Sequence, residues 1–138
     1  LTRGRTLDRL ATALGASGRA DEGLPIMHQA FDAVGLAGDE RELGILHIHR
    51  ATLYAELCRF GEALAAASAA LRVAKARGDP YIESVAHWAT SLVHERRGDL
   101  AAALSAREEE LSLLDRVGNP WNVALPHSAR ARQTAARG

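Results

Sequence analysis

The stretch Tyr54-Ala55-Glu56-Leu57-Cys58-Arg59-Phe60-Gly61-Glu62-Ala63-Leu64 decides the fold of this 138-residue chain. Before it, apolar residues from Leu43 onward recur at the spacing of one helix face, and after it those from Leu64 to Ala74 do the same. The pattern is interrupted between the two runs. We therefore predict a helix that ends near Cys58-Arg59, a tight turn, and a second helix from about Gly61 to Arg77.

The ends of this helical hairpin carry capping signals. Asp39 is followed three residues later by Glu42, the pattern of a capping box. Gly78 can end the second helix in the left-handed conformation, and Asp79-Pro80 suits the N-cap and first position of another helix. Residues 39–78 are therefore predicted to form one unit of two antiparallel helices.

The unit recurs at a step of 40 residues, read directly from the numbering. Equivalent pairs inside the units are Gly23-Leu24, Ala63-Leu64 and Ala103-Leu104. Equivalent unit boundaries are Gly38-Asp39, Gly78-Asp79-Pro80 and Gly118-Asn119-Pro120, and equivalent turn residues are Gly18, Cys58 and Gly98. Such a repeat indicates an all-α array of stacked helix pairs. We predict one domain with units at about 1–38, 39–78 and 79–118.

Two prolines, Pro25 and Pro126, lie at positions where the repeat predicts a helix. Pro25 lies near the start of a helix expected from about Asp21, so we predict at most a distortion of its first turn. In residues 119–138, Trp121, Val123 and Leu125 resemble the opening of a further helix, but Pro126 then interrupts. The tail is interpreted as a partial repeat or polar capping helix, or else as a frayed end.

Composition excludes several classes of function. The 17 basic and 17 acidic residues cancel, so no long-range attraction to nucleic acid or anionic lipid is expected. Cys58 is the only cysteine and can form no internal disulfide. No apolar run approaches the roughly 20 residues of a membrane span, and no signal peptide is visible. We expect a cytoplasmic protein without membrane association. Because Leu1 replaces an initiating methionine, we also expect a fragment of a longer chain.

The turn stretch at 54–64 and its equivalent, Arg97-Gly98-Asp99-Leu100-Ala101-Ala102-Ala103-Leu104, resemble the tetratricopeptide repeat family over about residues 5 to 125. The 40-residue unit is longer than usual and is similar to repeats of bacterial, actinobacterial-type transcriptional regulators. The sequence departs from the family at Arg50 and Thr90, where leucine is usual, and at Glu110, where alanine is usual.

The resemblance implies a right-handed superhelix whose concave face is lined by the first helix of each pair. The implied partner-binding residues are Ile45, Ile48, His49, Thr52, Glu56, Val85, Trp88, Leu92 and Arg96, and the groove positions of the family also map onto Asp8, Thr12 and Glu95. Several are apolar, which is typical of a recognition surface. Trp88 is the strongest candidate, although it could equally pack in the core between helices.

No catalytic, metal or cofactor site is expected. His47 and His87 are repeat-equivalent, but adjacent helices lie about 10 Å apart, too far for both rings to bind one zinc ion without leaning inward. The run Glu108-Glu109-Glu110 is interpreted as a solvated helix face, because consecutive residues diverge around the axis. Cys58 lacks the combination of basic and histidine neighbours that would indicate a reactive thiol.

The leading hypothesis is therefore a module that binds a protein or peptide, as the regulatory part of a larger bacterial transcriptional regulator. Two alternatives stay open: a domain that senses a small molecule, and a domain that self-associates into a homodimer. An enzyme is not expected, because function requires a site and none is visible.

Overall fold

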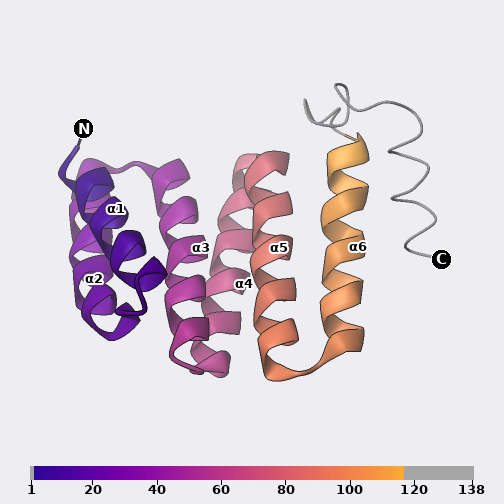
Figure 1. The fold of residues 1–138 in the computed structure, drawn as a ribbon. Helices are drawn as coiled ribbons and strands as arrows, with labels where there is room; N and C mark the ends of the chain where they lie inside the picture. Colours follow the sequence, from indigo (N-terminus) through magenta and orange to yellow (C-terminus); the bar gives the residue numbers. More distant parts are fainter. Residues whose placement is uncertain (1, 117–138) are drawn as a thin grey trace, which may run out of the picture.

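The computed structural model describes residues 2–116, and helices are its only regular secondary structure there. The helices are α1 (Arg3–Ala16), α2 (Ala20–Ala37), α3 (Glu40–Glu56), α4 (Phe60–Arg77), α5 (Pro80–Arg97) and α6 (Leu100–Arg116). They stand side by side in a row that runs from α1 and α2 to α6 (Figure 1). The all-α prediction is confirmed. The predicted partial repeat at 119–138 lies outside the described residues.

The helices pack as pairs, and the pairs stack on one another. α1 packs on α2, α3 on α4 and α5 on α6, while α2 contacts α3 and α4 contacts α5 across the two junctions between pairs. The first helices α1, α3 and α5 also contact each other in sequence. They form a continuous layer, and we call its outer surface the first-helix face.

Side-chain caps start the first helices. Thr2 Oγ1 accepts a hydrogen bond from the Arg5 amide, while Asp39 and Asp79 cap α3 and α5 in the same way. Only one of the two hydrogen bonds of the capping box predicted at Asp39 forms. Asp39 Oδ1 accepts from the Glu42 amide at 3.0 Å, but the Glu42 carboxylate pairs with Arg5 of α1, 3.5 Å from its Nε. Glu42 thereby ties α1 to α3.

The predicted helix ends are confirmed at the glycines. Gly38, Gly78 and Gly98 adopt positive φ at the ends of α2, α4 and α5. Cys58 adopts the same conformation, with φ 57°, in the turn between α3 and α4. A non-glycine residue in this region is strained, because its Cβ approaches the following carbonyl oxygen.

Small residues let the helices of a pair approach closely. A Cβ atom added to Gly23 would lie 2.7 Å from the backbone oxygen of Ala11, so α1 and α2 cross almost backbone to backbone. The equivalent residue of the second pair, Ala63, is fully buried. α2 remains helical through Pro25.

Two apolar clusters form the core. The first joins the α1–α2 pair to α3 and contains Met27, Leu46 and Leu53, all nearly inaccessible to solvent. The second joins α3 and α4 to α5 and is built largely of alanine, with Ile48 and Ile82. Within residues 2–116, no helix is both long and apolar enough to cross a membrane.

Candidate functional site

The first-helix face of α5 carries an apolar stripe that ends in a charge. Tyr81, Val85, Trp88, Leu92 and Arg96 follow one another at intervals of three or four residues, so they share one side of the helix. Tyr81 is 62% exposed, whereas Val85, Trp88 and Leu92 are half-buried. Tyr81 was not among the predicted residues. Its position four residues before Val85 is the signal that could have identified it.

The first-helix face of α3 is more polar than that of α5. Ile45, His49 and Thr52 are half-buried there, and Glu56 is exposed. The expectation that Ile48 is exposed is wrong. Ile48 is only 3% exposed and belongs to the second core cluster, because α5 covers this side of α3.

Trp88 occupies the position in α5 that Ile48 occupies in α3. It packs against the second core cluster together with Ile45 and Val85, yet stays half-buried. Trp88 therefore packs against the core and is also partly accessible, and its role in binding stays a prediction. A substitution at Trp88 would disturb core packing as well as the surface.

One polar bridge crosses from α1 to α3. His49 Nδ1 lies 2.7 Å from Asp8 Oδ1, and the Asp8 side chain is only 8% exposed. A carboxylate oxygen accepts hydrogen bonds, so the Nδ1–H group of His49 is the donor and the Nε2 side of the ring is not used in this bridge. His49 is 35% exposed and can therefore offer Nε2 to a partner.

A second bridge crosses from α3 to α5. Arg96 Nη2 lies 2.7 Å from Glu56 Oε1, and both side chains are about 40% exposed. Exposed ion pairs contribute at most about 1 kcal/mol to stability. Either side chain can therefore leave this ion pair and bind a charged group of a partner protein with little loss of stability.

The first-helix face contains a shallow hollow between α1 and α3. Its volume is about 190 Å³, and it is lined by Thr12, Gly15, Ala16, Thr52, Leu53 and Glu56. Pockets for drug-sized ligands typically enclose roughly 300–1,000 Å³. The hollow suits a single side chain of a larger partner better than a whole small molecule.

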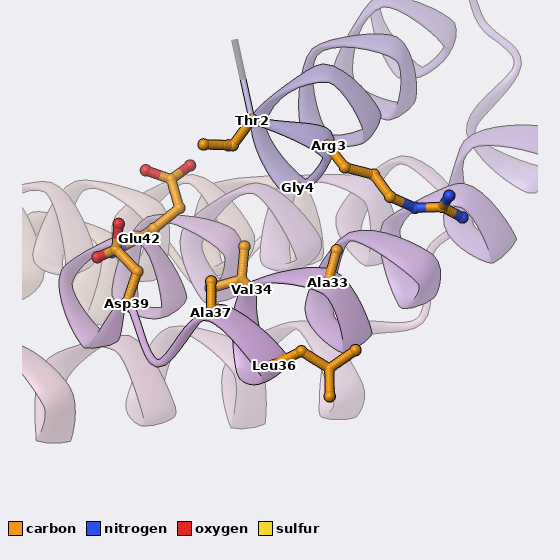
Figure 2. A pocket seen from close by; sticks show the side chains of 9 residues that line it. All are labelled: Thr2, Arg3, Gly4, Ala33, Val34, Leu36, Ala37, Asp39 and Glu42. Carbon is orange, nitrogen blue, oxygen red and sulfur yellow. The ribbon is translucent and has the colours of Figure 1, made fainter.

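A larger hollow, of about 280 Å³, lies at the N-terminal edge of the array, among the starts of α1 and α3 and the end of α2. Figure 2 shows Asp39 and Glu42 on one side of it and Arg3 on the other. Asp39 caps α3 and Glu42 pairs with Arg5. The carboxylates of this hollow thus stabilise the fold, and Leu36, which also lines it, is 92% exposed.

The histidines at equivalent positions of α3 and α5 lie in different surroundings. Burial, together with Arg50 and Arg72, lowers the pKa of His47 to about 4. Burial also lowers the pKa of His87, although Glu109 and Glu83 oppose the shift.

Residues 2–116 bring together no group of three or more His, Cys, Asp or Glu side chains that could hold a metal ion. Burial raises the pKa of Glu110 on α6, against the effect of Arg107.

The family model described as Anaphase-promoting complex subunit 5 matches residues 16–96, more than half of the 138-residue chain. The match runs from the end of α1 through most of α5 and so includes α3 and the apolar stripe of α5. No curated protein and no solved structure matches the chain.

Proposed function

The chain belongs to the family of anaphase-promoting complex subunit 5, a tetratricopeptide-like helical repeat family, and from this membership we propose a protein-interaction module that binds its partner on the first-helix face. The proposed contact residues of α3 are Ile45, His49, Thr52 and Glu56. Those of α5 are Tyr81, Val85, Leu92 and Arg96, with Trp88 at the edge. Ile48 supports this surface from beneath.

The observation that carries the proposal is the α5 stripe beside the polar face of α3. Tyr81, Val85 and Leu92 offer apolar area at helical spacing, which suits the apolar side of a partner helix or an extended peptide. Glu56, Arg96 and His49 stand beside it and can select charged or hydrogen-bonding residues. Together they form the mixed apolar and polar surface that protein partners use.

Two features favour a protein partner over a small metabolite. The hollow of about 190 Å³ on this face is too small to bury a typical ligand. The matched family is named for a subunit of a multiprotein complex. The narrower hypothesis of a regulatory part of a cytoplasmic bacterial transcriptional regulator rests only on the long repeat unit, and we retain it as one form of the broader proposal.

The test is site-specific photo-crosslinking in lysate of the source cell. A photoreactive residue at position 81 should capture a protein whose yield falls at least about fivefold in the Leu92→Ser, Arg96→Ala variant, because a contact pair of this kind contributes roughly 1–2 kcal/mol. Leu36→Ala is the matched control, since Leu36 is exposed at the other edge and should leave the yield unchanged.

Two results would count against the proposal. Equal capture by the double variant would show that the first-helix face is not the contact. Capture of this chain alone, together with a dimer in light scattering, would establish self-association instead.

A further inference from the structure

Two arginines beside the α2–α3 junction form no ion pair with a carboxylate of residues 2–116. Arg50 of α3 and Arg72 of α4 both lower the pKa of His47, and no carboxylate is among the groups that act on this ring. Most other arginines of these residues form ion pairs. Arg50 and Arg72 therefore form a cationic cluster whose charge the described residues leave unbalanced.

Neighbouring rings hold the Arg50 guanidinium in place. It lies 4.1 Å from the centre of the Phe31 ring, and its Nη2 is 3.2 Å from Nδ1 of His47. A guanidinium only donates hydrogen bonds, so Nδ1 is the acceptor and the neutral His47 ring carries its proton on Nε2. Arg50 Nε is buried and has no acceptor within residues 2–116. The side chain is thus fixed in position without a negatively charged partner.

The stacking of helix pairs does not require these arginines. Thr90 and Ser112 stand 40 residues after Arg50 and Arg72, yet α4 packs on α5 as α2 packs on α3. An unpaired, half-buried guanidinium with a buried donor that lacks an acceptor destabilises the fold. Departures from local stability of this kind are expected at functional sites.

The cluster lies on the side of α3 that points away from the first-helix face. His47 stands two residues after Ile45 and two before His49, so its side chain diverges from both. Arg50, three residues after His47, shares its side of the helix. Arg72 is exposed on the neighbouring α4. A ligand of this cluster therefore leaves the first-helix face free.

An apolar hollow adjoins the cluster. It has a volume of about 310 Å³ and lies between the start of α3 and the end of α4. Arg72 lines it together with Leu43, one helical turn before His47, and with Val73 and Ala76. An apolar side chain fits this hollow, so the cluster suits an anionic group that is attached to a peptide.

We propose that His47, Arg50 and Arg72 form a binding site for the phosphate of a phosphorylated serine or threonine of a partner protein. The two guanidinium groups match the charge of such a phosphate, about −1.5 to −2 at pH 7, whereas one carboxylate would leave a positive charge unbalanced. Arginine binds phosphate oxygens through paired N–H groups, and Nε2–H of the His47 ring is a further donor. The side chain next to the phosphorylated residue then occupies the apolar hollow.

NMR titration of the 138-residue protein with a blocked tripeptide of alanine, phosphoserine and leucine tests the site. The ring resonances of His47 and the Nε–H resonance of Arg50 should shift together as the peptide binds. At saturation the pKa of His47 should rise above its value of about 4, because a nearby anion favours the protonated ring. The pKa of His87, at the equivalent place in the α4–α5 junction, should stay unchanged.

Three variants separate the site from general charge attraction. Arg50→Leu places the residue that is usual in the repeat family and should fold, and Arg72→Gln alters an exposed side chain. Each should weaken binding of the phosphoserine peptide about fivefold or more, through loss of charge-assisted hydrogen bonds. Lys75→Gln is the matched control, since it removes one exposed positive charge from the same helix and should leave the affinity unchanged.

Two further probes identify the anion and its source. A tripeptide with glutamate in place of phosphoserine, and inorganic phosphate alone, should each bind more weakly than the phosphoserine peptide. Equal affinity for the glutamate peptide would overturn the proposal in favour of a carboxylate, and equal affinity for inorganic phosphate would overturn it in favour of the free ion. An equal loss in all three variants, or no shift at His47, would also overturn it. The three substitutions lie outside the first-helix face, so these outcomes are independent of the proposed contact there.

Discussion

The α2–α3 junction and the α4–α5 junction occupy equivalent places in the array but are filled by different side chains. In the first, α2 contributes Met27 and Phe31, and Arg50 of α3 lies above the Phe31 ring. In the second, α4 contributes Ala67 and Leu71 at the positions of Met27 and Phe31. Met27 and Ala67 are both buried, so the same position in the register is filled by a large side chain in one junction and by a small one in the other.

This difference shows that the repeat determines which positions contact each other across a junction. The volume and charge of the side chains at these positions differ from one junction to the next. The histidines show the same separation. His47 is flanked by Arg50 and Arg72, whereas His87 lies near Glu83 and Glu109 as well as Lys75. The imidazole of His47 thus has only cations nearby among these groups, whereas that of His87 has both carboxylates and a cation. The two junctions should respond differently to substitution and to pH.

The largest expected effect is a loss of volume in the first junction. Met27 is fully buried, so Met27→Ala should lower the free energy of unfolding by about 3 kcal/mol, through lost burial and the cavity left behind. Thermal unfolding followed by circular dichroism should show a midpoint about 10 °C lower. An effect below about 1 kcal/mol would mean that the first junction collapses around the cavity.

The reciprocal substitution tests whether the junctions are interchangeable. Ala67 is 1% exposed, and Ala67→Met would insert extra volume into a close helix contact, at a cost of roughly 1–3 kcal/mol. If Ala67→Met stabilises the protein instead, the second junction holds unused space, and the contrast in packing is wrong.

The next effect is a pH dependence that originates in the first junction. The pKa of His47 is about 4 in the folded protein and about 6.5 when unfolded, so between these values only the unfolded chain binds the proton. The stability contributed by the neutral ring is complete above pH 6.5 and is lost as pH falls toward 4. Because the ring is partly exposed, we expect a loss of about 1–2 kcal/mol after allowance for solvent screening.

Urea unfolding at pH 7.0, 5.5 and 4.5 measures this slope. His47→Gln should flatten it, since the variant has no ring to protonate. His87→Gln should flatten it less, because Glu109 and Glu83 oppose the shift at His87. An unchanged slope in His47→Gln would assign the acid sensitivity to other groups.

The fold was predictable from the sequence because its signals are local. Asp39, Asp79, Gly78 and Pro80 mark helix ends through hydrogen bonds within a few residues, and the structure places α3, α4 and α5 within a few residues of the expected bounds. The register then follows from the 40-residue step. These features need no knowledge of what packs across the array.

The candidate site was less predictable because exposure depends on the neighbouring helix. Ile48 and Trp88 are equivalent in register, but α5 covers Ile48. The bridges Asp8–His49 and Glu56–Arg96 join different pairs, and their partners are about 40 residues apart in sequence. Only side-chain geometry across the stacked helices reveals them.

A smaller effect on stability is expected at the turns within the helix pairs, where equivalent positions again hold different residues. Cys58 adopts a φ of 57° where the turns of the other pairs have Gly18 and Gly98. Cys58→Gly should raise the free energy of unfolding by about 0.5–1 kcal/mol, because relief of left-handed strain exceeds the entropy that glycine adds to the unfolded chain. Gly98→Ala is the matched opposite and should destabilise by a similar amount. Thermal denaturation of the pair measures both signs, and destabilisation by Cys58→Gly would mean that the thiol makes a compensating contact.

The smallest expected effect separates burial from charge in the first junction. Burial is the main cause of the low pKa of His47, and Arg50, whose Nη2 lies 3.2 Å from His47 Nδ1, is the next. Arg50→Leu should therefore raise the pKa of His47 but leave it below 6.5, as a titration of the ring resonances by NMR would show. Arg72→Gln, which removes the weaker cation, should raise it less. If Arg50→Leu restores the pKa of His47 to 6.5, charge and not burial is the cause of the low value. A junction lined by alanine would then lower the pKa of its histidine equally, provided that it had the same cations.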